Sequence, residues 1–202
     1  MWRRVSINLK LNFLKGGDFV KRLLLIFIIS VTLALSGCTS YDRNIEHYER
    51  DAEKYYADGF MPALDSLEGY TDARYLSKKV ESLFSVHSMC LTLTSDRENF
   101  AAEKARVSGA YAYLDSPVVS EFDADLYTVP AVSFSHAGFD FRVVSAEDMV
   151  YPKYFGMIGI SDEKCEIAYL WVYDPDLDYV CEADADLEKE MIEQMESWFS
   201  FE

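Results

Sequence analysis

Two apolar segments on either side of a short polar break decide the fold class, and they read YFGMIGI at residues 154–160 and CEIAYLWVY at residues 165–173. Both are short and rich in β-branched and aromatic side chains, which is typical of strands rather than helices. The break reads SDEK at residues 161–164 and has a common length for a hairpin loop. These residues therefore predict an antiparallel hairpin.

Other strand patterns lie on the amino-terminal side of this hairpin. Residues 139–144 read FDFRVV and residues 89–94 read MCLTLT, and in each the apolar side chains recur at every second position. A short strand is also expected around Tyr127. Because the strands come in clusters joined by short loops, an antiparallel sheet is favoured.

Three segments carry apolar side chains at helical spacings of three and four, which predicts amphipathic helices at residues 41–58, 96–114 and 187–199. Ser95 is expected to cap the second helix, with Glu98 three positions on, and Asp186 or Asp184 to cap the third. The expected fold class is therefore α+β: an antiparallel sheet of about five to six strands packed with amphipathic helices, preceded by an N-terminal tether helix.

The composition excludes some partners. The chain has 202 residues, with 35 Asp and Glu against 19 Lys and Arg, and its formal net charge is −16. Nucleic acid and anionic bilayer surfaces both attract positive potential, so neither is expected to bind this chain through its charge. The length suits one domain of ordinary size.

The amino-terminal region has the layout of a secretory signal. Lys21 and Arg22 precede 13 residues, 23–35, that are almost all apolar, and Cys38 follows shortly after. Thirteen residues fall short of the roughly 20 that a helix needs to cross the hydrocarbon core of a membrane. Leu35-Ser36-Gly37-Cys38 resembles the lipobox of bacterial lipoproteins, and the body of the chain loosely resembles small uncharacterised lipoproteins of Gram-positive bacteria.

The resemblance implies a division of the chain and a place for it in the cell. Residues 20–37 would be a lipoprotein signal peptide, and the Cys38 thiol would receive diacylglycerol before cleavage on its amino side. Residues 38–60 would then be the anchor and tether helix, and residues 61–202 a single α+β domain. The protein would be held by its lipid at the extracytoplasmic face of the cell membrane. The alternative is a leucine-rich segment that ends by chance in Ser-Gly-Cys.

Residues 1–19 fit badly ahead of such a signal, because they hold four cations and an acid where a short leader is normal. Lys15-Gly16-Gly17-Asp18 can be encoded by a strong ribosome-binding site, and Val20 by the start codon GTG. We therefore expect translation to start at codon 20, with residues 1–19 a wrongly assigned extension. A real extension of the signal is the alternative.

The residues that carry chemistry form no familiar catalytic or metal-binding motif. Asp174, Asp176 and Asp178 alternate as in the opening of an EF-hand loop, but Tyr179 and Ala185 occupy the positions where that loop needs Gly and Glu. An acidic turn that faces water is the expected role of these residues. We therefore expect no catalytic residue, no cofactor and no metal site.

Cysteine pairing is the remaining covalent question. If Cys38 carries lipid, three cysteines are left, so at least one thiol is unpaired. Cys165 and Cys181 could close a disulfide outside the cytoplasm, but their spacing alone does not establish it.

The sequence thus favours a non-enzymatic, lipid-anchored binding or interaction module whose partner is an unknown protein or small molecule. The alternative is a cell-envelope hydrolase with a site assembled only in three dimensions, which predicts a cleft where at least two of His87, His136, Glu147 and Asp148 meet. A substrate-binding subunit of a transporter is less favoured, since the 165 residues from Cys38 to Glu202 leave little room for two lobes.

Overall fold

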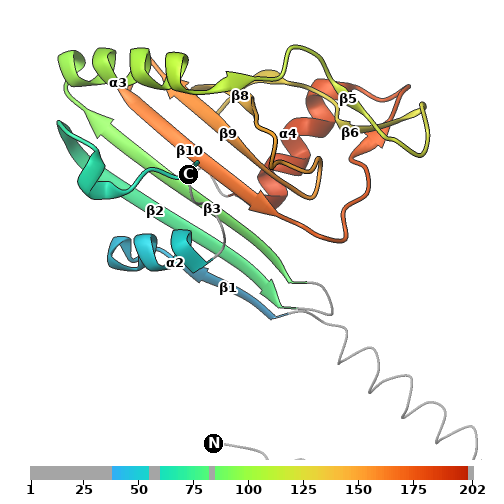
Figure 1. Ribbon diagram of the computed structural model, residues 1–202, viewed down its shortest axis with the longest axis horizontal. Coiled ribbons are helices and arrows are strands. Elements are labelled where there is room, and N and C mark those ends of the chain that lie inside the picture. Colours follow the sequence, from blue (N-terminus) through green and yellow to red (C-terminus); the bar gives the residue numbers. More distant parts are fainter. Residues whose placement is uncertain (1–37, 55–59, 82–84, 200–202) are drawn as a thin grey trace, which may run out of the picture. The chain divides into compact units, whose positions relative to one another are not determined.

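A computed structural model describes residues 38–54, 60–81 and 85–199 (Figure 1). The extension at residues 1–19 and the signal peptide at residues 20–37, both expected from the sequence, lie outside the described residues. Among the described helices, none is both long enough and apolar enough to cross a membrane.

An eight-stranded antiparallel sheet forms the centre of the fold. Its strands run in the order β1-β2-β3-β10-β9-β8-β4, and β7 also pairs with β8. The strands are β1 (Cys38–Asp42), β2 (Tyr70–Glu81), β3 (Val86–Ser95), β4 (Ala112–Tyr113), β7 (Ser133–His136), β8 (Phe139–Ser145), β9 (Tyr154–Ser161) and β10 (Glu166–Tyr173). The long strands β2, β3 and β10 lie side by side along its middle (Figure 1).

Smaller elements complete the structure. A three-stranded sheet contains β5 (Val118–Val119), β6 (Leu126–Val129) and β11 (Cys181–Glu182) in the order β11-β6-β5. The helices are α2 (Tyr48–Lys54), α3 (Arg97–Ala110) and α4 (Leu187–Trp198), with the 3-10 turns η1 (Ile45–His47) and η2 (Leu64–Ser66). The described part of the chain is therefore mostly antiparallel sheet with three short α-helices.

The α+β fold class, with five to six strands and a tether helix, is wrong. Within the described part of the helix expected at residues 41–58, the α-helical residues are the seven of α2, and the start of the segment belongs to strand β1. Residues 38–42 pair with residues 77–81 along the edge of the main sheet. Strands of two to five residues, such as β4 and β5, are too short to show an alternation of apolar and polar residues. The sequence pattern therefore predicts fewer strands than the sheet contains.

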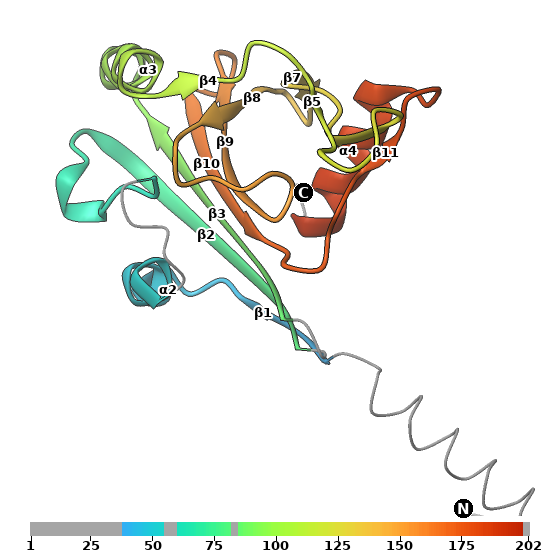
Figure 2. The same cartoon turned by 45° about the vertical axis from the view of Figure 1, so that its right-hand side comes forward.

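The sheet separates the hydrophobic core into two clusters. Directly opposite residues of antiparallel strands share a face, and the buried Leu91 lies opposite both Tyr75 and Tyr169. This first face packs against α2 and α3. The second face carries Leu170 and Met157 and packs against α4. Figure 2 shows α2 and α4 on opposite sides of the sheet.

Local predictions around the hairpin are confirmed. Strands β9 and β10 pair antiparallel with Ser161 opposite Glu166, so the polar break forms the expected turn. Asp186 caps α4 as one of the two expected residues, and its side chain accepts a hydrogen bond from the Lys189 backbone N–H. The cap of α3 is Asp96 rather than Ser95, because the Asp96 carboxylate accepts the N–H of the third helical residue while Ser95 still belongs to β3.

Candidate functional site

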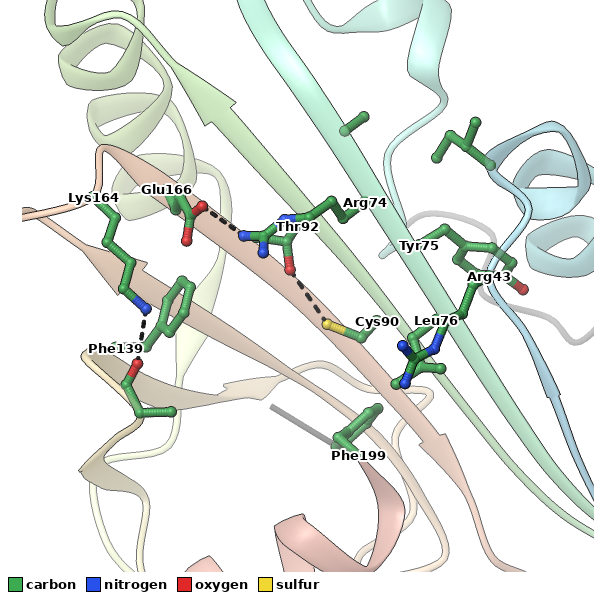
Figure 3. Close-up of a pocket in the computed structure, with 13 residues that line it drawn as sticks. Arg43, Arg74, Tyr75, Leu76, Cys90, Thr92, Phe139, Lys164, Glu166 and Phe199 are labelled. Carbon is green, nitrogen blue, oxygen red and sulfur yellow. Dashed lines mark hydrogen bonds and ion pairs between the residues drawn. The ribbon is translucent and has the colours of Figure 1, made fainter. Parts of the chain in front are cut away.

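A pocket of about 470 Å³ lies at strand β2, mainly on the second face of the sheet, beside the carboxyl end of α4 (Figure 3). We call it the sheet pocket. Its volume falls within the range of small-molecule sites in proteins. Its lining residues are Arg43, Ile45, Ala73, Arg74, Tyr75, Leu76, Cys90, Thr92, Ala137, Phe139, Lys164, Glu166 and Phe199.

The strand register brings the central lining residues together. Arg74 of β2 lies opposite Thr92 of β3, and Thr92 lies opposite Ala168 of β10. Glu166 is two residues before Ala168 and therefore projects from the same face. The centre of the site is thus built from side chains of three adjacent strands that project from one face.

Glu166 is the buried acid of the sheet pocket. Its Oε1 accepts hydrogen bonds from the Arg74 guanidinium at 2.5 Å and from the Thr94 hydroxyl at 3.1 Å. The residue is 8% exposed, and its other oxygen, Oε2, is buried with no hydrogen-bond partner among the described residues. An unsatisfied buried acceptor costs about 1–3 kcal/mol, so this oxygen would gain from a donor brought into the pocket.

Cations outnumber acids in the sheet pocket. Arg43, Arg74 and Lys164 line it together with one carboxylate, that of Glu166, so the described lining residues carry a formal excess of two positive charges. The Lys164 ammonium donates to the Ala137 carbonyl at 3.1 Å and lies 5.2 Å from the centre of the Phe139 ring. Its contacts among the described residues include no acid. A positive pocket in so acidic a chain favours an anionic group.

The opposite end of the sheet pocket is mainly apolar, although the Arg43 side chain also lies at this end (Figure 3). Leu76, Cys90 and Phe199 lie there, away from Lys164 and Glu166 (Figure 3). Burial raises the pKa of the Cys90 thiol to about 11, so this cysteine is protonated at neutral pH and is a poor nucleophile. These side chains can hold an apolar group but cannot attack it.

Cys38, the expected lipid attachment site, is exposed at the first position of edge strand β1. It lies opposite Glu81 of β2, seven residues along that strand from Arg74. At about 3.3 Å per strand residue, this separation corresponds to about 23 Å. Leu76, the lining residue of β2 nearest to the expected anchor, is five residues from Glu81, or about 17 Å at the same rise.

The hydrolase residues expected from the sequence do not converge. His136 Nε2 lies 3.2 Å from Glu196, and Asp148 accepts a hydrogen bond from the Tyr154 hydroxyl at 3.3 Å. His87 lies in a second pocket of about 330 Å³ on the first face of the sheet, where its Nε2 is 2.9 Å from the Ser77 hydroxyl. Neither of the two pockets described is lined by two of the four expected residues.

The remaining sequence candidates are dispersed. Cys165 and Cys181 are both free thiols, one in the β9–β10 turn and the other in β11 of the small sheet. Asp178 pairs with Lys153 at 2.8 Å. Within residues 38–54, 60–81 and 85–199, no group of three His, Cys, Asp or Glu side chains has the geometry to hold a metal ion.

Sequence reasoning missed Arg74, Lys164 and Glu166. One signal was present, because Glu166 heads a strand face that continues with Ala168 and Leu170. A charged residue at the start of an otherwise apolar face indicates either an exposed strand end or a buried site. Only the register of β2 against β3 shows that Arg74 lies within reach.

The sheet pocket thus offers cationic donors, a buried carboxylate and a mainly apolar end, and burial keeps the Cys90 thiol protonated at neutral pH. Comparison with known proteins adds no family to this description. No protein-family model, curated protein or solved structure matches the chain.

Proposed function

We propose that this protein is a lipid-anchored, extracytoplasmic binding protein that holds a small anionic ligand in the sheet pocket. The observation that carries the proposal is the excess of cationic side chains, Arg43, Arg74 and Lys164, in one pocket of a strongly acidic chain. Arg and Lys donate charge-assisted hydrogen bonds to carboxylates and phosphates.

The anchor rests on the lipobox resemblance and on the exposure of Cys38. Cleavage before Cys38 would remove six cations and one acid, which leaves 13 cations and 34 acids. That charge would be repelled by anionic lipids, so attachment would depend on the acyl chains. Each buried methylene contributes about 0.8 kcal/mol, and two or three chains give stable attachment.

Membrane fractionation tests the anchor. Cys38→Ala should move the protein out of the membrane fraction and abolish its labelling by a palmitate analogue. Cys165→Ala is the matched control, since it removes a different thiol, and should leave both unchanged. Unchanged fractionation of the Cys38 variant would contradict the anchor without bearing on the pocket.

Anion binding tests the pocket. In calorimetric titrations, 3-phenylpropanoate, which joins a carboxylate to an apolar group, should bind the full chain in detergent. Lys164→Met should weaken binding at least tenfold because it removes one cationic donor. Lys189→Met is the control, since Lys189 is an exposed cation on α4 that pairs with Glu193 at 3.0 Å. Equal binding by both variants would contradict the proposed site.

A second candidate function, a cell-envelope hydrolase, is favoured by one observation: the Ser77 hydroxyl lies 2.9 Å from His87 Nε2. A nucleophile beside a base has this geometry. Both residues are more than nine-tenths buried, which restricts access to the hydroxyl. Hydrolysis of p-nitrophenyl acetate that Ser77→Ala abolishes would support this function, and activity unaffected by that change would exclude Ser77 as the nucleophile.

A further inference from the structure

We propose that the ligand of the sheet pocket is a free α-amino acid with an apolar side chain. The inference rests on the proposed function, and it adds to the anionic group a positively charged amine and an apolar substituent. Three observations support the three parts of such a ligand: the unsatisfied oxygen of Glu166, the cationic donors on either side of it, and the apolar end of the pocket.

The buried Oε2 of Glu166 can accept a hydrogen bond from a ligand. Arg74 and Thr94 both donate to Oε1, and Oε2 has no hydrogen-bond partner among the described residues. An ammonium group presents three N–H donors and a positive charge, so it is well matched to a desolvated carboxylate oxygen. An anion without a donor group would leave Oε2 unsatisfied and would place a second negative charge beside Glu166.

The carboxylate of the ligand has cationic donors close to the same point. Figure 3 shows Glu166 between Lys164 and Arg74. Lys164 uses one of its three N–H donors on the Ala137 carbonyl, and Arg74 uses one of its five on Glu166. Both retain donors for a second carboxylate. A ligand with an ammonium and a carboxylate on one carbon atom matches this arrangement. Its ammonium would bind Glu166, and its carboxylate would bind Lys164 or Arg74 on either side.

The apolar side chain has its own part of the pocket. Leu76, Cys90 and Phe199 line the end away from Lys164, and protonation keeps the Cys90 thiol uncharged. A branched or aromatic side chain placed there would lose contact with water, at about 25 cal/mol per Å² of apolar surface. An uncharged polar side chain would gain nothing from the contacts with Leu76, Cys90 and Phe199.

Matched ligands separate the three parts. The full chain, purified in detergent, is titrated calorimetrically with L-leucine and L-phenylalanine, with their analogues that lack the amine, 4-methylpentanoate and 3-phenylpropanoate, and with leucinamide and phenylalaninamide, which lack the carboxylate. At least one amino acid should bind ten or more times more tightly than both of its analogues. Glycine, which lacks the apolar part, should bind more weakly than either amino acid.

Two variants test the residues. Glu166→Gln should reduce the preference of the pocket for the amino acid over the amine-free acid to less than threefold. Lys164→Met should weaken the amino acid and the amine-free acid but not the amide, and it leaves the buried Arg74–Glu166 pair intact if Glu166→Gln fails to fold. Lys189→Met should change none of the affinities.

The outcomes distinguish the two proposals. Amine-free acids that bind as tightly as the amino acids overturn the amino-acid inference and leave anion binding standing. Binding by the amides alone overturns both, as does the absence of binding by all of these compounds.

Discussion

The Arg74 guanidinium lies 2.5 Å from the Glu166 carboxylate, although the two residues are on strands β2 and β10 with β3 between them. Glu166 is buried, whereas the Arg74 side chain is about half exposed. Arg74 therefore compensates the negative charge of Glu166, which β10 would otherwise bury without a cation. The guanidinium N–H groups that do not bind Glu166 remain available to the sheet pocket.

Arg74→Met should lower the free energy of unfolding by about 1–3 kcal/mol, because it leaves a buried carboxylate without its cation. Glu166→Gln should be less destabilising, since the amide oxygen can still accept from Arg74 and Thr94. Lys189→Met, which breaks an exposed ion pair, should change stability by less than about 0.5 kcal/mol. Urea unfolding followed by tryptophan fluorescence measures all three. If Arg74→Met and Lys189→Met lower the free energy of unfolding equally, the buried Arg74–Glu166 pair contributes no more to stability than an exposed ion pair.

Glu103 should make stability dependent on acid pH. Burial alone would raise its pKa, but hydrogen bonds from Arg106 and from the buried Tyr169 hydroxyl outweigh burial and hold the pKa below its ordinary value of 4.5. A carboxyl with a lowered folded pKa contributes stability that is present above pH 4.5 and is lost as pH falls through the folded pKa. Arg106→Met should flatten this part of the stability profile, measured by urea unfolding between about pH 5 and 2. An unchanged slope would contradict the role of Arg106.

Gly159 is required for close packing on the second face of the sheet. A Cβ at Gly159 would lie 2.4 Å from the Phe141 ring, which no native contact tolerates. Gly159→Ala should therefore destabilise the protein by about 1–3 kcal/mol through overpacking. Gly109→Ala is the matched control, because it meets no atom within 4 Å on an exposed turn of α3 and should stabilise by about 0.5–1 kcal/mol. Thermal unfolding of the two variants should shift in opposite directions, and a shift in the same direction would contradict this account.

Cys90 should resist alkylation at neutral pH. Burial raises its pKa to about 11 and also shields the sulfur from solvent. In a Cys38→Ser, Cys165→Ser background, iodoacetamide at pH 8 should modify Cys90 at a measurable rate only after unfolding, as mass spectrometry of the Cys90 peptide shows. Rapid labelling of the folded protein would mean that the sheet pocket exposes a reactive thiolate.

Local order was accessible from the sequence. The hairpin at residues 154–173, strand β8 and the Asp186 cap of α4 follow from short-range patterns of apolar and capping residues, and the structure contains them. Tyr169 and Trp171, on the second strand of this hairpin, are buried core residues. On their face of the sheet, the Tyr169 hydroxyl donates a hydrogen bond to Glu103 and accepts one from Arg106, both of α3. Helix α4 covers the opposite face of the same strand.

Assembly was not accessible in this way. The sheet has more strands than expected because several are too short to show a period, and residues 38–42 become an edge strand only because β2 offers them a partner. The expected convergence of histidines and acids fails for a related reason, since their neighbours in space are set by strand register.

The sequence by itself determined the elements whose signals are local: the hairpin, the caps, the overall acidity and the lipobox-like segment that ends at Cys38. Only the tertiary structure decided that Arg74, Lys164 and Glu166 share one pocket. Arg74 and Glu166 are 92 positions apart and meet because β3 pairs with β2 on one side and with β10 on the other. A register between distant strands depends on the packing of both sheet faces, which no short stretch of sequence encodes.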